Sequence, residues 1–140
     1  MCEDVTLIEP SEQAISRASL HIQNRVQRIR TINKGFNDLV EGDLISKDTT
    51  VHIFSNILDV ELFSLSNLIS IVDKVFNGVN YFIVSSPYIN TSRTARIDSF
   101  IHYFQNKYYY DEYLSIDQPK GKWIKNWSRV IRVGKIIQDA

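Results

Sequence analysis

Apolar residues along this chain fall into short continuous runs that alternate with segments of helical period. Val5–Ile8 is such a run, closed by Glu9 and Pro10, and it predicts a buried strand. Ser11 follows as a candidate helix cap, and apolar residues then recur every three or four positions between 14 and 26. The first part of the chain therefore predicts a strand followed by an amphipathic helix.

The middle of the chain repeats this alternation. Residues 28–32 predict a weaker strand, and 36–40 predict a helical turn after the break at Asn33-Lys34-Gly35. The run 50–54 predicts a buried strand. Ser64 is expected to cap a helix with one apolar face, which the pair Asn77-Gly78 ends.

The last part of the chain changes character. Residues 80–85 predict another buried strand, and Ser92 is expected to begin a helix. Two long β-rich segments, 108–116 and 127–137, then predict an antiparallel hairpin with a long connection. The predicted fold class is therefore α/β, with a mostly parallel sheet and a C-terminal antiparallel hairpin at its edge.

Composition narrows the class of protein without identifying a partner. The 140 residues predict a single domain, and their 16 basic and 16 acidic side chains balance to zero. One cysteine excludes a disulfide framework, and the three histidines match no metal-ligand spacing. With no membrane-spanning run and no signal peptide in these residues, a cytoplasmic protein is expected.

The element order, together with the residues that end the strands, resembles class I S-adenosylmethionine-dependent methyltransferases from their second strand onward. That family has a Rossmann-like sheet of seven strands, of which the last two form an antiparallel pair. In such folds ligands bind outside the carboxyl ends of the parallel strands. The resemblance therefore implies S-adenosylmethionine as the cofactor and a methyl acceptor that the residues do not identify.

VTLIEPSEQAISRA resembles the second strand of this family and the helix after it. An acidic residue at that strand end holds the two ribose hydroxyls of the cofactor, and Glu9 occupies this position. A carboxylate suits the role because its two oxygens can accept from a vicinal diol. The alternative is that Glu9 only begins the turn before Pro10 and Ser11.

NKGFNDL resembles the segment after the third strand, where an Asp or Asn meets the adenine amino group. Asn37 and Asp38 are the candidates for that contact. Short polar residues of this kind also cap helical turns, and that reading stays open.

VHIFSNILDVE resembles the fourth strand and the turn beyond it. The resemblance places Ser55 and Asn56 beside the methionine end of the cofactor, and it expects Leu58 to pack inward. Alternatively, Ser55 and Asn56 cap a strand and a helix in a site that has lost its ligand.

The resemblance does not include the family's first strand, which ends in a glycine-rich turn. The chain has five glycines and no GxG. In the family the missing strand lies between the second and the fourth, so its absence leaves buried edges without partners. Three explanations are open: a longer polypeptide, a separate chain that supplies the strand, or a degenerate fold in which the second and fourth strands pair directly. We therefore expect residues 1–140 to form a single, partial methyltransferase-like domain.

The C-terminal hairpin offers a second class of function. Between Pro119 and Ile137 the basic residues are interleaved with two tryptophans, and the range contains no acidic residue. Basic and aromatic residues in this arrangement can bind nucleic acid. The candidate contacts are Lys120, Lys122, Lys125, Arg129 and Arg132. The alternative to a methyltransferase is thus a non-catalytic methyltransferase-like module for interaction or nucleic-acid binding. A structural explanation also stays open, because edge strands carry basic residues that block aggregation.

Overall fold

The computed structural model of the chain describes residues 2–45, 47–55, 57–58, 60, 63–87, 90–118 and 126–137. The chain divides into two compact units, Met1–Leu44 and Ile45–Ala140. That the two together make one domain stays a prediction.

The smaller unit is a parallel pair of strands with one helix. Strand β1 (Cys2–Ile8) leads into helix α1 (Glu12–Ile22), and the chain returns as strand β2 (Val26–Ile32), parallel to β1. The predicted cap is confirmed, since Ser11 Oγ accepts from the Ala14 N–H at 3.3 Å. The turn predicted at 36–40 is a 3₁₀ helix, η1 (Phe36–Asp38), which is followed by η2 (Glu41–Asp43).

Polar contacts hold the end of the smaller unit together. The Arg30 guanidinium donates to the carbonyls of Asp43 and Gly42 at 2.7 and 2.8 Å. Lys34 Nζ pairs with Asp43 Oδ2 at 2.9 Å, and this contact lowers the pKa of Asp43, with a further contribution from the Val40 N–H. Hydrogen bonds and an ion pair thus connect much of this unit.

The larger unit is a four-stranded sheet with two helices. Its elements are β3 (Thr49–Ser55), α2 (Leu65–Val75), β4 (Val79–Pro87), α3 (Thr91–Lys107), β5 (Tyr108–Gln118) and β6 (Asn126–Ile137). The strand order is β3-β4-β6-β5. β3 and β4 are parallel, whereas β6 runs antiparallel to both β4 and β5, so the predicted α/β sheet with its antiparallel edge hairpin is confirmed.

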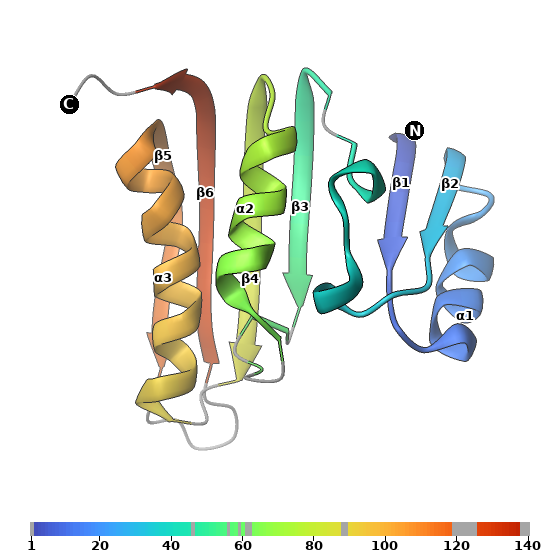
Figure 1. Cartoon of the computed structure of the whole chain (residues 1–140), viewed down its shortest axis with the longest axis horizontal. Coiled ribbons are helices and arrows are strands. Elements are labelled where there is room, and N and C mark those ends of the chain that lie inside the picture. The colour runs from blue at the N-terminus through green and yellow to red at the C-terminus, as the bar shows by residue number, and fades with distance from the viewer. Residues whose placement is uncertain are drawn as a thin grey trace. The chain divides into compact units, whose positions relative to one another are not determined.

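Helices α2 and α3 cover the same face of this sheet (Figure 1). Side chains alternate along β3 and β4, so Phe54 and Phe82 point to the helices. Phe82 packs against Phe100 and Phe104 of α3 with ring centroids 5.6 and 4.8 Å apart, and Phe54 meets Phe100 edge-on. These aromatic contacts form the centre of the core.

One helix boundary differs from the prediction. Helix α3 begins at Thr91, one residue before Ser92, and its cap is Asn90, whose side chain accepts from the Arg93 N–H at 2.9 Å. An Asn side chain at this position satisfies an orphan helix donor as well as a Ser does. The cap of α2 is Ser64, as predicted, and its side chain accepts from the Asn67 N–H.

A polar pair lies under the helices, formed by the buried Asn80 and the partly buried His52. His52 stacks on Phe82 at 4.8 Å, and its Nε2 lies 2.8 Å from Asn80 Oδ1. Because Asn80 Nδ2 donates to the Asn77 carbonyl, Oδ1 is the acceptor and His52 Nε2 carries the proton. Burial lowers the pKa of His52, and the bond to Asn80 only partly opposes this effect.

A tight turn connects α2 to β4. Gly78 has a φ of 59°, and a Cβ there would lie 2.2 Å from the Asp48 carbonyl oxygen. The next residue, Val79, donates its N–H to the same oxygen at 2.8 Å. The predicted stop at Asn77-Gly78 is therefore confirmed, and it needs glycine both for the left-handed backbone and for the close approach.

Asp73 of α2 anchors the far ends of α3 and β5. Its Oδ2 accepts from Tyr103 at 2.9 Å and from Lys107 at 2.5 Å, and its Oδ1 accepts from Tyr108 at 2.6 Å. Burial opposes ionisation of Asp73, but these donors together lower its pKa. Burial and the bond to Asp73 raise the pKa of Tyr108 to about 12.

No helix in the described part of the chain is long and apolar enough to cross a membrane.

Candidate functional site

Glu9 lies where the resemblance expects it, directly after the carboxyl end of β1. Its backbone N–H donates to the Ile32 carbonyl at the end of β2, and its carbonyl accepts from Asn33 Nδ2 at 3.0 Å. Its side-chain Oε1 accepts from the Ser11 N–H at 2.9 Å. One carboxylate oxygen therefore takes part in the turn that precedes α1, and the ribose-binding role of Glu9 stays a prediction.

Asn37 and Asp38 lie in η1, just beyond the end of β2, and both are exposed. Asn33 connects this end of the sheet to the Glu9 turn, because its Nδ2 donates to the carbonyls of both Glu9 and Pro10. The structure thus brings three of the predicted residues to the carboxyl ends of two adjacent parallel strands. This is the edge of a parallel sheet at which ligands bind.

Ser55 is the last residue of β3 and is exposed, and it pairs in register with Ser85 of β4. The next residue of β4, Ser86, is buried, and its Oγ has no hydrogen-bond partner in the described part of the structure. Asn56 lies outside the described residues. The carboxyl ends of β3 and β4 therefore present small polar side chains, as predicted for the first of these strands.

The loop after β3 is fastened by Arg96 of α3, a residue that the sequence analysis did not single out. Arg96 donates to the carbonyls of Leu58 and Phe63 at 3.2 and 2.9 Å, and its guanidinium lies 5.0 Å from the centre of the Phe63 ring. Leu58 is fully buried, which confirms its predicted inward packing. The sequence offered no signal for Arg96 beyond a basic residue within a predicted helix.

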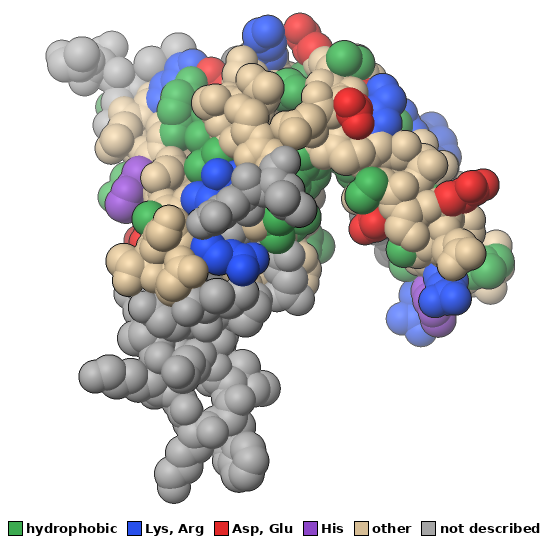
Figure 2. All heavy atoms as spheres, turned by 60° about the horizontal axis from the view of Figure 1, so that its bottom comes forward, with side chains coloured by type: hydrophobic (Ala, Val, Ile, Leu, Met, Phe, Trp, Pro, Cys, Tyr) green, Lys and Arg blue, Asp and Glu red, His purple; other side chains and the backbone are tan. Residues whose placement is uncertain are grey.

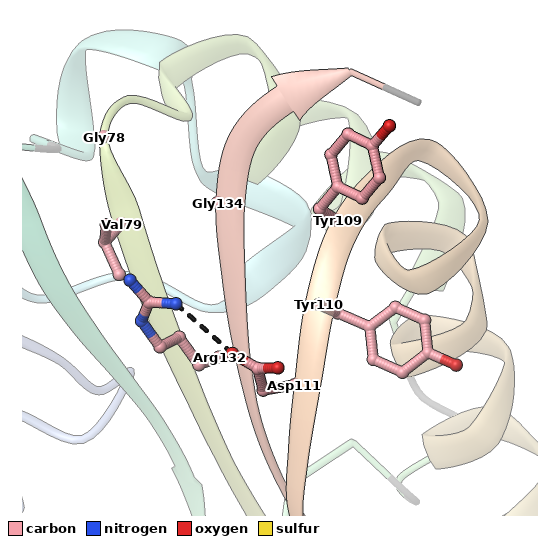
Figure 3. Close-up of a pocket in the computed structure, with 7 residues that line it drawn as sticks. All are labelled: Gly78, Val79, Tyr109, Tyr110, Asp111, Arg132 and Gly134. Carbon is pink, nitrogen blue, oxygen red and sulfur yellow. Dashed lines mark hydrogen bonds and ion pairs between the residues drawn. The ribbon is translucent and has the colours of Figure 1, made fainter. Parts of the chain in front are cut away.

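The described surface has a pocket of about 500 Å³ at the other end of the larger unit (Figure 3). It lies at the start of β4, where Gly134 of β6 leaves open space next to Val79. Its lining residues are Gly78, Val79, Tyr109, Tyr110, Asp111, Arg132 and Gly134. Since β4 is parallel to β3, this pocket is at the opposite end of the sheet from Ser55 and is not the predicted cofactor site.

The basic residues of the hairpin take different positions. Arg129 is only 8% exposed, and it pairs with Asp98 of α3 at 2.9 Å. Arg132 pairs with Asp111 across β5 and β6 at 3.3 Å. Lys120, Lys122 and Lys125 lie outside the described residues. Arg129 thus supports the packing of α3 on the sheet, and contact of this cluster with nucleic acid stays a prediction.

Figure 2 shows Lys and Arg side chains beside apolar ones on one face of the described surface. Among the described residues no group of three or more His, Cys, Asp or Glu side chains could hold a metal ion. The side chains at the strand ends offer a carboxylate, amides and hydroxyls. Such groups bind polar parts of an organic ligand.

Neither a protein-family model nor a curated protein sequence matches the chain. Solved structures do. An rRNA methylase from Streptococcus thermophilus is 12% identical, with a TM-score of 0.57 over 94% of this chain and 75% of that one. The precorrin-6y C5,15-methyltransferase of Geobacter metallireducens is 14% identical, with a TM-score of 0.57 over 95% and 67% of the two chains.

A third similar structure contains a ligand. It is a protein from Streptococcus mutans, assigned as a methyltransferase and solved in complex with SAH, the demethylated form of the cofactor. Its identity is 10%, and its TM-score is 0.59 over 95% of this chain and 76% of that one. At these identities the similarity concerns the fold. Together with the observed strand order, it shows that this chain has the fold of class I S-adenosylmethionine-dependent methyltransferases.

Proposed function

We propose that this chain is an S-adenosylmethionine-dependent methyltransferase or the C-terminal part of one. The observation that supports the proposal is the fold, which in a similar protein holds SAH. Within the smaller unit polar side chains lie at the carboxyl ends of β1 and β2, and within the larger unit they lie at the end of β3. When bound, the cofactor supplies an electrophilic methyl group on a sulfonium. The protein then has mainly to position an acceptor nucleophile in line with that methyl group.

Glu9 is the residue proposed to bind the ribose hydroxyls. Its Oε1 already accepts from the Ser11 N–H, which fixes the carboxylate at the end of β1. A carboxylate has about four acceptor positions, so a diol can share it with that N–H. Asn37 and Asp38 are proposed for the adenine amino group, and Ser55 with Asn56 for the methionine end.

The polar groups at the strand ends suit the cofactor. The 140 residues differ from the family in the backbone that approaches the cofactor. Glu9 is partly buried and Ser55 is exposed, so both are open to a ligand. The glycine-rich turn, through which the family approaches the cofactor closely, is not in this sequence. We therefore expect weaker cofactor binding by these residues than by a chain that includes the turn.

The test is calorimetric titration of S-adenosylmethionine and SAH into the folded chain and into Glu9→Gln. Glutamine keeps an oxygen for the Ser11 N–H but loses the charge, so the start of α1 survives. We expect Glu9→Gln to weaken binding by about tenfold or more, as for the loss of hydrogen bonds to a charged group. Ser55→Ala should weaken binding less, because a neutral hydroxyl contributes less.

Glu12→Gln is the matched control, because Glu12 is an exposed acid in the first turn of the same helix. It should bind the cofactor like the unchanged chain. Equal binding by the Glu9 and Glu12 variants would remove Glu9 from the site. Absence of binding by a chain whose circular dichroism shows it folded would contradict cofactor binding by these residues.

A further inference from the structure

The pocket at the start of β4 is a hollow on the sheet face that α2 and α3 do not cover (Figure 1, Figure 3). Gly134 and Arg132 of β6 line it, and they alternate with Val133, which is fully buried on the side of the helices. The volume of about 500 Å³ is in the range of small-molecule sites. Because the pocket and Ser55 lie at opposite ends of the sheet, its ligand is not the proposed cofactor.

An irregularity of the sheet opens the hollow. The pairing of β5 with β6 shifts register between Tyr108 and Tyr110, so residues 134–136 of β6 lie opposite the single residue Tyr109. Gly134 has no side chain, and a Cβ there would meet nothing within 4 Å. Sheets carry bulges of this kind next to active sites, where they redirect side chains. The open space is therefore a property of the backbone.

The walls of the pocket are aliphatic and aromatic. Val79 lines the side of β4, whereas Tyr109 and Tyr110 line the side of β5. The two tyrosines are 56% and 46% exposed, so their rings are open to a ligand. Exposed aromatic rings provide surfaces on which a planar group can stack. These walls therefore fit a flat ligand with apolar faces.

A charged pair gives the pocket a polar edge. Arg132 Nη1 donates to Asp111 Oδ2 at 3.3 Å, and Figure 3 shows the two side chains pointing toward one another. Both side chains are at least partly exposed. A guanidinium has five N–H donors and a carboxylate has two acceptor oxygens, so this contact leaves hydrogen-bonding capacity on both groups. The pocket thus offers strong donors directly beside a strong acceptor.

We propose that this pocket binds a guanine base. Guanine has the acceptor O6 directly beside the donors N1–H and N2–H, so Arg132 donates to O6 while the Asp111 carboxylate accepts from the two donors. The base lies above Gly134, between Val79 and Tyr109. Adenine is the weaker ligand, because it offers the carboxylate a single amino group that is flanked by acceptors. Binding of guanine here does not depend on the cofactor or on methyl transfer.

The test is calorimetric titration of guanosine monophosphate (GMP) and adenosine monophosphate (AMP) into the folded chain and its variants. Asp111→Asn keeps one acceptor and loses the charge, so GMP affinity should fall by about tenfold or more and the preference over AMP should shrink. Glu112→Gln is the matched control, because Glu112 is the next residue of β5, is exposed and does not line the pocket. It should bind GMP like the unchanged chain.

Gly134→Val tests the hollow itself. It places a side chain in the space that is open at the Cβ position, so it should abolish GMP binding while the circular dichroism stays unchanged. If this variant does not fold, the Asp111 variant decides, and unchanged GMP affinity there overturns the proposal. Glu9→Gln should bind GMP normally, which separates this pocket from the proposed cofactor site.

Short single-stranded RNAs distinguish the two sources of the base. An oligouridine that contains one guanosine should bind more tightly than GMP if the base belongs to RNA, and no more tightly if it belongs to a free nucleotide. The proposal is overturned if the folded chain binds no GMP or binds AMP equally well. It is also overturned if a folded Gly134→Val chain binds GMP like the unchanged chain.

Discussion

The two units of the chain obtain their cohesion in different ways. In the larger unit, the core combines side chains of all four strands and two helices, with Phe82, Phe100 and Phe104 at its centre. In the smaller unit, Ile15 and Leu39 are the only buried apolar side chains among the described residues. Ion pairs there join β1 to β2 and η2 to Lys34, which follows β2.

The difference in apolar burial indicates which unit has the weaker core of its own. Two strands and one helix bury little apolar surface, and an isolated two-stranded sheet is only marginally stable. Exposed ion pairs add little to that stability because water and salt screen them. The larger unit has a core of its own, and the smaller unit, which carries Glu9, Asn37 and Asp38, has very little of one.

The largest effect is expected in the core of the larger unit. Phe104 is fully buried and packs against Phe76, Phe82, Phe100 and Tyr108. Phe104→Ala should lower the free energy of unfolding by about 3–5 kcal/mol, through lost burial and the cavity that remains. Urea denaturation measures this change. A loss below about 1 kcal/mol, close to that of the exposed control Tyr109→Ala, would mean that the aromatic cluster does not carry the stability of this unit.

The next effect is expected at the turn before β4. Gly78→Ala places a Cβ against the Asp48 carbonyl in a left-handed backbone, so it should lower the free energy of unfolding by about 2 kcal/mol or more. Gly42→Ala in the smaller unit is the control, because a Cβ there meets nothing within 4 Å. Thermal unfolding of both variants tests the contrast, and equal midpoints would contradict it.

A smaller effect should appear as a pH dependence of the larger unit. The folded-state pKa of His52 is lowered from the usual 6.5, so the unfolded chain binds more protons than the folded chain below that pH. Stability should therefore be fully present above about pH 6.5 and decline as the pH falls toward the folded pKa. Urea unfolding between pH 5 and 8 measures the slope. His52→Gln should flatten it, whereas replacement of the exposed His102 should leave it unchanged.

The smallest effect is expected in the smaller unit. Asp4 Oδ1 and Arg28 Nε lie 2.5 Å apart in an exposed ion pair that joins β1 to β2. Asp4→Asn should leave the thermal midpoint unchanged in physiological salt, because screening cancels most of the attraction. A clear decrease in the midpoint would show that this unit depends on its surface charges after all.

Much of the fold was predictable because its signals are local. The cap at Ser64 and the stop at Asn77-Gly78 depend on hydrogen bonds and backbone angles within a few residues. The apolar runs predicted the strand ends at which Glu9 and Ser55 lie, whereas their candidate roles came from the family resemblance. The role of Arg96 was not predictable, since its partners Leu58 and Phe63 are more than 30 residues away.

By itself the sequence determined the order of the elements, their caps and the polar residues that end the strands, because period and capping are local properties of the chain. Only the tertiary structure decided that β6 lies between β4 and β5, that Arg129 is buried against Asp98 while Lys107 pairs with Asp73, and that Val51 and Ile53 stay exposed. These outcomes depend on which faces pack together. An alternating apolar pattern shows that a strand has a buried side, but only the packed helices determine which of two apolar sides it is.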